Sequence, residues 1–339
     1  MDLKTFCKRI PKIELHAHLN GSVSLKTLLK LSELQSPADA KSQIIHEIHP
    51  SESLKECFKL FEIVHSLTDT PETIFIATSD VIQEFYDDNV IYLELRSTPR
   101  HVEGKMTKRE YIEAIINAIK SPKIKKTGIT VKLLISVDRK RGAKNAEENI
   151  ALAIEYYEKY SEYVVGIDLS GDPIQGEISI DLLQRARNVG LKIAAHCAEV
   201  PNEKEVVDIL NFKPDRLGHC TCIHPNLNGT KQLYDMLLKS RIPVELCLTS
   251  NVKCKTVPSF SEHQFAYLYE AKHPICIATD DKGVFGTTLS AEFELVAIHF
   301  GLTRQNLKDL CLSAVQFAFA TEKEKSQLSL KIELFYNIN

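Results

Sequence analysis

Histidine and aspartate residues stand at the ends of several short apolar runs of this chain. His16 and His18 lie two residues apart at the end of the run 12–19. In a β-strand both side chains point to one face, so two imidazoles could reach a single cation. Three other apolar runs end in residues of the same kinds, namely His196, His219 and the pair Asp280 and Asp281. Imidazoles and a carboxylate that converge from separate strands are the ligand set of a catalytic zinc ion with one position left for water.

A possible proton donor follows one of these histidines. Glu199 comes three residues after His196. A carboxyl group beside a metal in a closed pocket can have a raised pKa and act as an acid. Its alternative interpretation is an ordinary acidic residue in the first turn of a helix. Surface or loop positions are expected for five other histidines: His101, His224, His263, His273 and His299.

The apolar runs alternate with amphipathic stretches. We predict eight strands, at 12–19, 90–97, 129–137, 163–169, 190–196, 215–219, 242–249 and 274–280. Most are separated by helical patterns, at 72–88, 108–120, 144–160, 179–189, 203–210, 229–240 and 262–272. Strands that alternate with helices pair in parallel through right-handed crossovers. Eight such units predict an α/β fold, the (β/α)8 TIM barrel, in which residues at the carboxyl ends of the strands surround the active site. An open doubly wound sheet is the alternative.

The first connection is longer than one crossover helix needs. Residues 20–89 contain three helical patterns, at 24–35, 38–47 and 52–66. Insertions at this end of a barrel commonly cap the site, so we expect a helical lid.

Length and composition favour a single domain in a cytoplasmic protein. The chain has 339 residues, with no linker-like or repeated segment, so we expect one barrel domain over 1–339. A net charge of −3 gives no field for nucleic acid, and no run is long and apolar enough for a membrane span or a signal peptide. The nine cysteines are then most simply reduced thiols in a cytoplasmic protein. A monomer is the default expectation.

Four motifs together resemble those of the adenosine deaminase family of amidohydrolases, in order and in spacing. They are Lys12-Ile-Glu-Leu-His-Ala-His-Leu-Asn-Gly21, His196-Cys-Ala-Glu199, Leu217-Gly-His219 and Ala278-Thr-Asp-Asp281. The resemblance extends from residue 12 to about residue 320. It implies that one Zn²⁺ is held by four ligands: His16, His18, His196 and Asp280. A second metal is not expected, because the fourth strand does not end in the lysine that bridges two metals in binuclear amidohydrolases.

The resemblance also implies roles around a purine base. Glu199 matches the acid that protonates ring nitrogen 1, and His219 matches the residue that orients the attacking water. Asp280 can take a proton from that water. Asp281 would bond ring nitrogen 7, and the backbone N–H of Gly171 would bond ring nitrogen 3.

One position departs from the pattern of ordinary adenosine deaminases, which have an aspartate that receives the ribose 5′-hydroxyl. This chain has Asn20 there, which avoids the repulsion between a carboxylate and a 5′-phosphate. Ser97, Thr98 and Arg100 lie at the end of the second predicted strand and could contact that phosphate. Weaker candidates for the same pocket are His65 and Asp138.

These features resemble the adenosine deaminase-like branch of the family, which acts on N6-methyl-AMP. The function implied is a zinc-dependent hydrolytic deaminase of N6-substituted purine nucleoside monophosphates, with a small purine nucleotide as its partner. A plain adenosine or 2′-deoxyadenosine deaminase is one alternative. A barrel that binds a purine or a protein without catalysis is another, although such a protein has no chemical need for metal ligands, an acid and a water-orienting group together.

Overall fold

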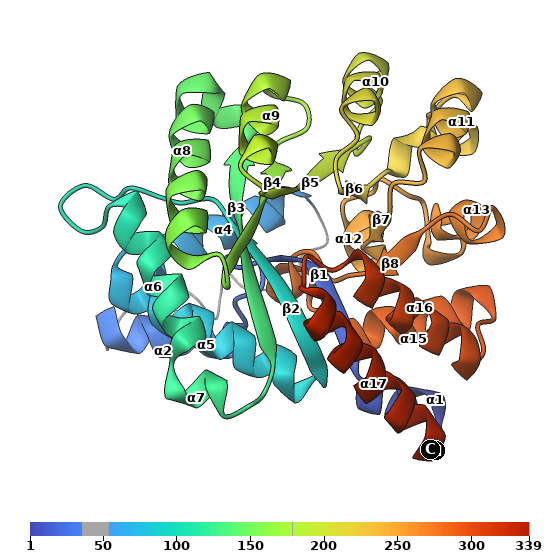
Figure 1. The fold of residues 1–339 in the computed structure, drawn as a ribbon, viewed down its shortest axis with the longest axis horizontal. Helices are drawn as coiled ribbons and strands as arrows, with labels where there is room; N and C mark the ends of the chain where they lie inside the picture. Colours follow the sequence, from blue (N-terminus) through green and yellow to red (C-terminus); the bar gives the residue numbers. More distant parts are fainter. Residues whose placement is uncertain (36–53, 178, 339) are drawn as a thin grey trace.

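Eight parallel strands form the centre of the computed structural model, which describes residues 1–35, 54–177 and 179–338 (Figure 1). They pair in chain order in one sheet: β1 (Lys12–His18), β2 (Val90–Ser97), β3 (Thr130–Asp138), β4 (Val164–Ser170), β5 (Lys192–Cys197), β6 (Arg216–His219), β7 (Val244–Leu246) and β8 (Ile275–Ile277). The segment after β8 returns to β1, because His18 N–H donates to the carbonyl of Asp280 at 3.0 Å and Asp280 N–H donates to that of His16 at 2.8 Å. The sheet is therefore nearly closed, which confirms the predicted barrel and excludes an open doubly wound sheet.

Helices surround the strands. Those of the first half are α1 (Leu3–Arg9), α2 (Leu25–Gln35), α4 (Leu54–Leu67), α5 (Pro71–Asp87), α6 (Lys108–Lys120), α7 (Pro122–Lys125) and α8 (Gly142–Tyr160). Those of the second half are α9 (Ile180–Asn188), α10 (Glu203–Phe212), α11 (Lys231–Ser240), α12 (Leu248–Lys253), α13 (Phe265–Glu270), α14 (Lys282–Phe285), α15 (Leu289–Phe300), α16 (Arg304–Phe317) and α17 (Glu322–Ile338). Short 3₁₀ turns occur at Arg139–Arg141, Thr221–Ile223, Pro225–Leu227 and Phe260–Glu262. None of the described helices is long and apolar enough to cross a membrane.

Local signals in the sequence explain where several helices begin. Thr70 caps α5 and exchanges hydrogen bonds with Thr73, and Pro71 occupies the first helical position. Thr107 and Glu110 form the same reciprocal capping box at the start of α6. Such caps satisfy amide groups that have no partner inside the helix.

The predicted strand over 242–249 is too long. β7 ends at Leu246, and α12 begins at Leu248. The early start of this helix depends on a distant residue, because the buried carboxylate of Glu292 accepts the backbone N–H of Thr249 at 3.1 Å and so caps the new helix. An apolar run does not by itself distinguish a strand from a buried helix. The predicted helix over 262–272 is also too long, because α13 covers only Phe265–Glu270.

The long first connection contains α2, α4 and α5. The helix predicted at 38–47 lies outside the described residues. α4 packs on α14 through a small apolar cluster, in which Leu60 and Phe61 meet Val284 and Phe285. This packing places α4 against the segment that follows β8 and its polar residues.

The two ends of the chain meet at one side of the barrel. The ring of Phe6 in α1 lies 6.0 Å from that of Phe335 and 5.6 Å from that of Tyr336, both in α17. In Figure 1 these helices are the blue and red ribbons that lie side by side. Helix α17 thereby covers the sequence that leads into β1.

Candidate active site

A cavity of about 670 Å³ opens at the carboxyl ends of the strands. This volume is within the range of small-molecule sites. The candidate residues that line it are His18, Asn20, His65, Ser97, Thr98, Arg100, Asp138, Gly171, His196, Glu199, His219, Asp280 and Asp281. His16 is fully buried beneath the cavity. Strand ends that are far apart in the chain thus surround one hollow.

Four of these side chains converge on a single point. One nitrogen from each of His16, His18 and His196 and one oxygen of Asp280 all lie within 4.8 Å of one another. Oδ1 of Asp280 is 3.3 Å from Nε2 of His16 and 3.3 Å from Nε2 of His18. Nε2 of His18 is 3.2 Å from Nε2 of His196. This is the donor set that a divalent transition metal prefers.

Two imidazoles of this group each have an acceptor beside Nδ1. Nδ1 of His16 lies 2.6 Å from Oε2 of Glu245. Nδ1 of His196 lies 2.8 Å from the carbonyl of Leu169. With its proton on Nδ1, each ring turns the lone pair of Nε2 toward the point of convergence. The buried Nε2 of His16 has no hydrogen-bond partner within the described ranges, so these residues fit a metal ion.

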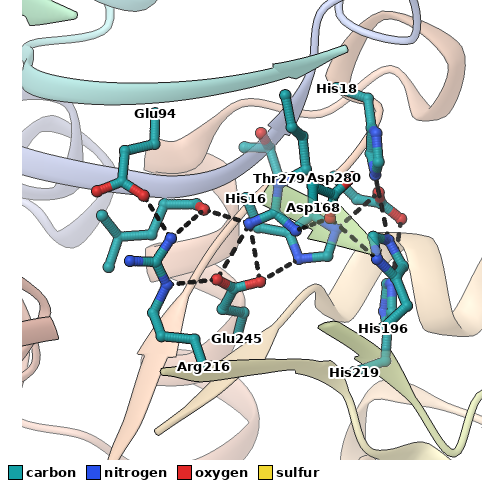
Figure 2. A network of polar contacts seen from close by, with 12 residues as sticks. His16, His18, Glu94, Asp168, His196, Arg216, His219, Glu245, Thr279 and Asp280 are labelled. Atoms are coloured by element: carbon teal, nitrogen blue, oxygen red, sulfur yellow. Dashed lines mark hydrogen bonds and ion pairs between the residues drawn. The ribbon is translucent and has the colours of Figure 1, made fainter. Parts of the chain in front are cut away.

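A buried network of charges supports the cluster from below, and Figure 2 shows Glu245 between Arg216 and His16. Arg96 pairs with Asp168 at 2.9 Å and with Glu245 at 3.0 Å. Nε of Arg216 lies 2.6 Å from Glu245 Oε1. Burial opposes ionisation of Glu245, but Arg96 and Arg216 together lower the pKa of this carboxyl well below its ordinary value. Glu245 therefore presents a negative charge to His16.

The backbone is strained where it delivers residues to the cavity. Ala198, His219 and Asp280 all have positive φ, at 53°, 62° and 60°. Residues other than glycine rarely adopt this conformation, and it concentrates at functional sites. Each lies just at or after the end of β5, β6 or β8, where it turns a side chain or its neighbour toward the cluster.

Glu199 and His219 face each other beside the cluster. Oε2 of Glu199 is 3.8 Å from Nε2 of His219, and that nitrogen is 3.9 Å from Oδ2 of Asp280. Oε1 of Glu199 is buried and makes no hydrogen bond to any residue that the structure describes. Ser250 donates a hydrogen bond of 2.7 Å to Asp280 Oδ2 and holds that carboxylate in place. An acid, a hydrogen-bonding imidazole and a carboxylate thus surround one small volume.

Two glycines allow close approaches here. Gly171 has a φ of 97°, and a Cβ at this position would lie 2.1 Å from Oδ1 of Asp138. A Cβ on Gly21 would lie 1.6 Å from Oδ1 of Asp281. Oδ1 of Asp281 is itself buried and unpartnered in the described part of the chain, while burial and the neighbouring Asp280 raise the pKa of this carboxyl well above its ordinary value.

Asn20 belongs to a chain of hydrogen-bonded polar groups. Its Nδ2 donates to the hydroxyl of Tyr111 at 3.3 Å, and that hydroxyl is 2.6 Å from Oγ of Ser97. Tyr111 is buried in α6, so its hydroxyl holds the side chains of Asn20 and Ser97 in position.

Arg100 lines the cavity but uses its guanidinium mostly within the protein. Nη1 donates to the carbonyl of His65 at 3.3 Å, and Nη2 donates to Oγ1 of Thr68 at 2.8 Å and to the carbonyl of Thr68. Its Nε is buried and has no partner among residues 1–35, 54–177 and 179–338. Burial, reinforced by Arg100 and Arg141, lowers the pKa of His65 to about 4. Arg100 thus ties the end of α4 to the residues after β2.

Sequence reasoning missed several groups around the cavity. Lys140 and Arg141 line it together with Asn251, although no motif marks them. His263 and His273 lie in loop segments, which is one of the two expected positions, but both are buried: His263 fully, and His273 with 4% exposure. An isolated histidine carries no signal of burial, because its partners come from other elements.

Comparisons with known proteins agree with this geometry. The family model described as adenosine deaminase matches residues 11–334. The chain is similar to the human N6-methyl-AMP deaminase, at 44% identity over 331 residues, which cover 96% of this chain and 93% of that protein. It is similar to the apo structure of the N6-methyl-AMP deaminase from Arabidopsis thaliana, with a TM-score of 0.89, 40% identity and coverage of 97% and 98%. It is also similar to a solved ADAL–IMP complex, with a TM-score of 0.90, 38% identity and full coverage of both chains.

The family match spans nearly the whole barrel and includes every residue of the cluster and the cavity. Relatives well above 30% identity cover the same length. Because the sequence match and the arrangement at the strand ends agree, this chain belongs to the adenosine deaminase family.

Proposed function

We propose that this protein is a zinc-dependent hydrolytic deaminase that converts N6-methyl-AMP and water to IMP and methylamine. One observation carries the proposal: the cavity beside the group of His16, His18, His196 and Asp280 is also lined by Asn20 and by basic side chains that include Arg100, Lys140 and Arg141. The similarity to proteins named N6-methyl-AMP deaminase, and to a complex with IMP, supports the same substrate class.

Zinc is proposed as the metal, one per chain, with His16, His18, His196 and Asp280 as its ligands. Three imidazoles and one carboxylate suit zinc better than calcium or magnesium, which prefer oxygen ligands. A bound zinc ion would lower the pKa of a water toward about 7 and so supply a nucleophile at neutral pH.

We propose that side chains around the cluster carry out the proton transfers. Asp280 can accept a proton from the attacking water, while His219 bonds the same oxygen. Glu199 can donate a proton to ring nitrogen 1, which makes carbon 6 electrophilic. A bond forms between carbon 6 and the water oxygen, and Asp280 passes the proton that it took from the water to the exocyclic nitrogen. The bond between carbon 6 and that nitrogen breaks, and the nitrogen leaves as methylamine. The second water proton leaves the oxygen as the 6-oxo group forms and restores the proton that Glu199 gave to ring nitrogen 1.

The rest of the purine nucleotide would be held by other residues of the cavity. We propose that Asp281 bonds ring nitrogen 7 and that the backbone N–H of Gly171 bonds ring nitrogen 3. At the 5′ end, Asn20 can donate to a phosphate without the repulsion that a carboxylate would exert. We propose that the remaining contacts to the substrate come from Ser97, Thr98, His65 and Asp138.

Residues 1–339 are proposed to act as one catalytic barrel, with the insertion of about 20–89 as a lid. Phe61 and His65 of α4 line the cavity, which supports a capping role. Closure would exclude water from the reacting centre.

The direct test compares three substrates with the purified protein: N6-methyl-AMP, AMP and adenosine. IMP and methylamine should form fastest from N6-methyl-AMP. Adenosine as the best substrate would instead favour the plain adenosine deaminase. Less than one zinc per chain, with no turnover after zinc is added, would favour a binding protein.

A further inference from the structure

Three buried side chains are linked by hydrogen bonds to His219 and to one another. Asn251 is 3% exposed, Gln264 is 1% exposed and His263 is fully buried. Nδ2 of Asn251 lies 3.2 Å from Nδ1 of His219. Oδ1 of the same amide lies 2.9 Å from Nε2 of His263 and 3.0 Å from Nε2 of Gln264. None of the four motifs that identify the family contains Asn251, His263 or Gln264.

A backbone N–H determines the direction of the hydrogen bond between His263 and Asn251. The N–H of Phe265 donates to Nδ1 of His263 at 3.0 Å. A backbone N–H can only donate, so Nδ1 carries no proton, and a neutral ring has its proton on Nε2. Burial lowers the pKa of His263 to about 3, which keeps this ring neutral. Nε2 of His263 therefore donates, and the atom of Asn251 that faces it must be the oxygen.

Gln264 independently identifies the same atom of Asn251 as the amide oxygen. Its Nε2 donates to the carbonyl of His219 at 3.0 Å. A carbonyl oxygen can only accept, which identifies the facing atom of Gln264 as nitrogen. The same nitrogen donates to Oδ1 of Asn251. Two donors thus converge on this oxygen, and a reversed amide would place its NH₂ group against both.

The orientation of Asn251 sets the protonation of His219. With Oδ1 turned to His263 and Gln264, only Nδ2 can face His219. Since an amide nitrogen is a donor, Nδ1 of His219 must accept. The proton of a neutral His219 then lies on Nε2, which points at the space between Glu199 and Asp280, 3.8 Å and 3.9 Å from their carboxylate oxygens.

We propose that Asn251, oriented by His263 and Gln264, is a positioning residue that holds His219 in the tautomer with its proton on Nε2. In this state His219 donates a hydrogen bond to the oxygen that adds to the substrate and has no lone pair on Nε2 to act as a base. Proton removal from water is then left to Asp280. The catalytic part of the inference rests on the deaminase function proposed above, but the tautomer itself does not.

The first test measures the tautomer without any substrate. Two-dimensional NMR of ¹⁵N-labelled, zinc-loaded protein distinguishes a protonated from an unprotonated ring nitrogen, and single histidine substitutions assign the signals. We expect Nδ1 of His219 to be unprotonated and Nε2 to be protonated. Nδ1 of His263 should likewise be unprotonated. A protonated Nδ1 on His219 would overturn the proposal whether or not the protein deaminates N6-methyl-AMP.

The second test reverses the polarity behind His219. Asn251→Asp keeps the size of the side chain but presents an oxygen, which can only accept, to Nδ1 of His219. Burial and the bound zinc ion disfavour a doubly protonated His219. His219 should then carry its proton on Nδ1 in the NMR spectrum. We expect kcat to fall by about 10²–10³-fold, as when one donor to a reacting oxygen is removed, with little change in KM. A folded, zinc-loaded variant with near wild-type kcat would contradict the proposal.

The third test uses a matched pair of buried histidines. His263→Phe removes the donor that orients Asn251, whereas His273→Phe removes a ring that donates to the carbonyl of Ile242 at 2.8 Å, outside the cavity. Both changes replace a buried imidazole with a similar ring. His263→Phe should lower kcat by about tenfold or more through the weakened orientation of one donor. Equal effects of the two changes on kcat would show that the role is merely structural.

Discussion

Nδ1 of His16 lies 2.6 Å from Oε2 of Glu245, and both side chains are fully buried. An imidazole at the end of β1 is thereby oriented by a carboxylate from β7, 229 residues further along the chain. Two arginines hold that carboxylate in its charged form. The charge that His16 experiences is thus set by Glu245, Arg96 and Arg216, which lie beneath the group of His16, His18, His196 and Asp280.

Glu245→Gln should weaken metal binding. The change removes the negative charge beside His16, and partners of this kind contribute about 10–100-fold to metal affinity. Zinc affinity, measured by competition with a chelator, should fall by that factor. Glu94→Gln is the matched control, because Glu94 accepts from Arg216, Tyr92 and the backbone of Phe319 in the same buried network but does not contact His16. An equal loss of affinity in both variants would contradict the role of Glu245.

Glu199→Gln should lower kcat by about 10²–10⁴-fold, the contribution of a positioned general acid. The amide keeps the shape of the side chain but cannot deliver the proton to ring nitrogen 1. Binding of IMP, measured by calorimetry, should change much less. Glu203→Gln, at an exposed position in the first turn of α10, serves as the control and should retain wild-type kcat.

Asn20→Asp should act selectively on nucleotides. A carboxylate about 4 Å from a phosphate charge opposes it by on the order of 4 kcal/mol at an effective dielectric of 20. Partial exposure of the site reduces this repulsion, so we expect kcat/KM for N6-methyl-AMP to fall by roughly 10²-fold. Adenosine turnover by the same variant is the internal control. A uniform loss for both substrates would show that Asn20 does not face the phosphate.

Gly21→Ala should displace Asp281, because the new Cβ would overlap the side chain of that aspartate. Misplacement of a substrate-contacting group by about 1 Å can cost on the order of 10²-fold in rate, and kcat/KM should fall accordingly. Zinc content should stay at one per chain. If the effect passes through Asp281, adding Asp281→Ala to Gly21→Ala should cause little further loss.

Acid should destabilise the fold through His263. Burial lowers its pKa from 6.5 to about 3 in the folded protein. As the pH falls below 6.5, the unfolded chain takes up a proton that the folded protein does not, so the free energy of unfolding decreases by about 1.4 kcal/mol per pH unit. His263→Phe has no imidazole at this position and therefore lacks this pH-dependent loss of stability. Urea titrations from pH 8 to pH 4.5 should therefore show the stability advantage of the wild type over His263→Phe narrowing at acid pH, and a constant difference would contradict the prediction.

Much of the architecture was predictable because it depends on local periodicity. Eight apolar runs separated by amphipathic stretches require parallel pairing, and parallel strands bring their carboxyl ends to one face. The sequence therefore predicts that residues at those ends, such as His16, His196 and Asp280, lie near one another. The same reasoning overextended β7, because the cap that Glu292 provides to α12 is supplied by a distant element.

The sequence by itself determined the barrel, the family and the residue types that converge on the cluster, because these follow from spacing and order along the chain. Only the tertiary structure decided which groups support them. The partners of His16, His219 and Arg100 come from β7, from the segment around α12 and α13, and from α4. Hydrogen-bond direction and burial depend on contacts between segments that no local pattern encodes, so the orientation of these side chains could be found only in the folded chain.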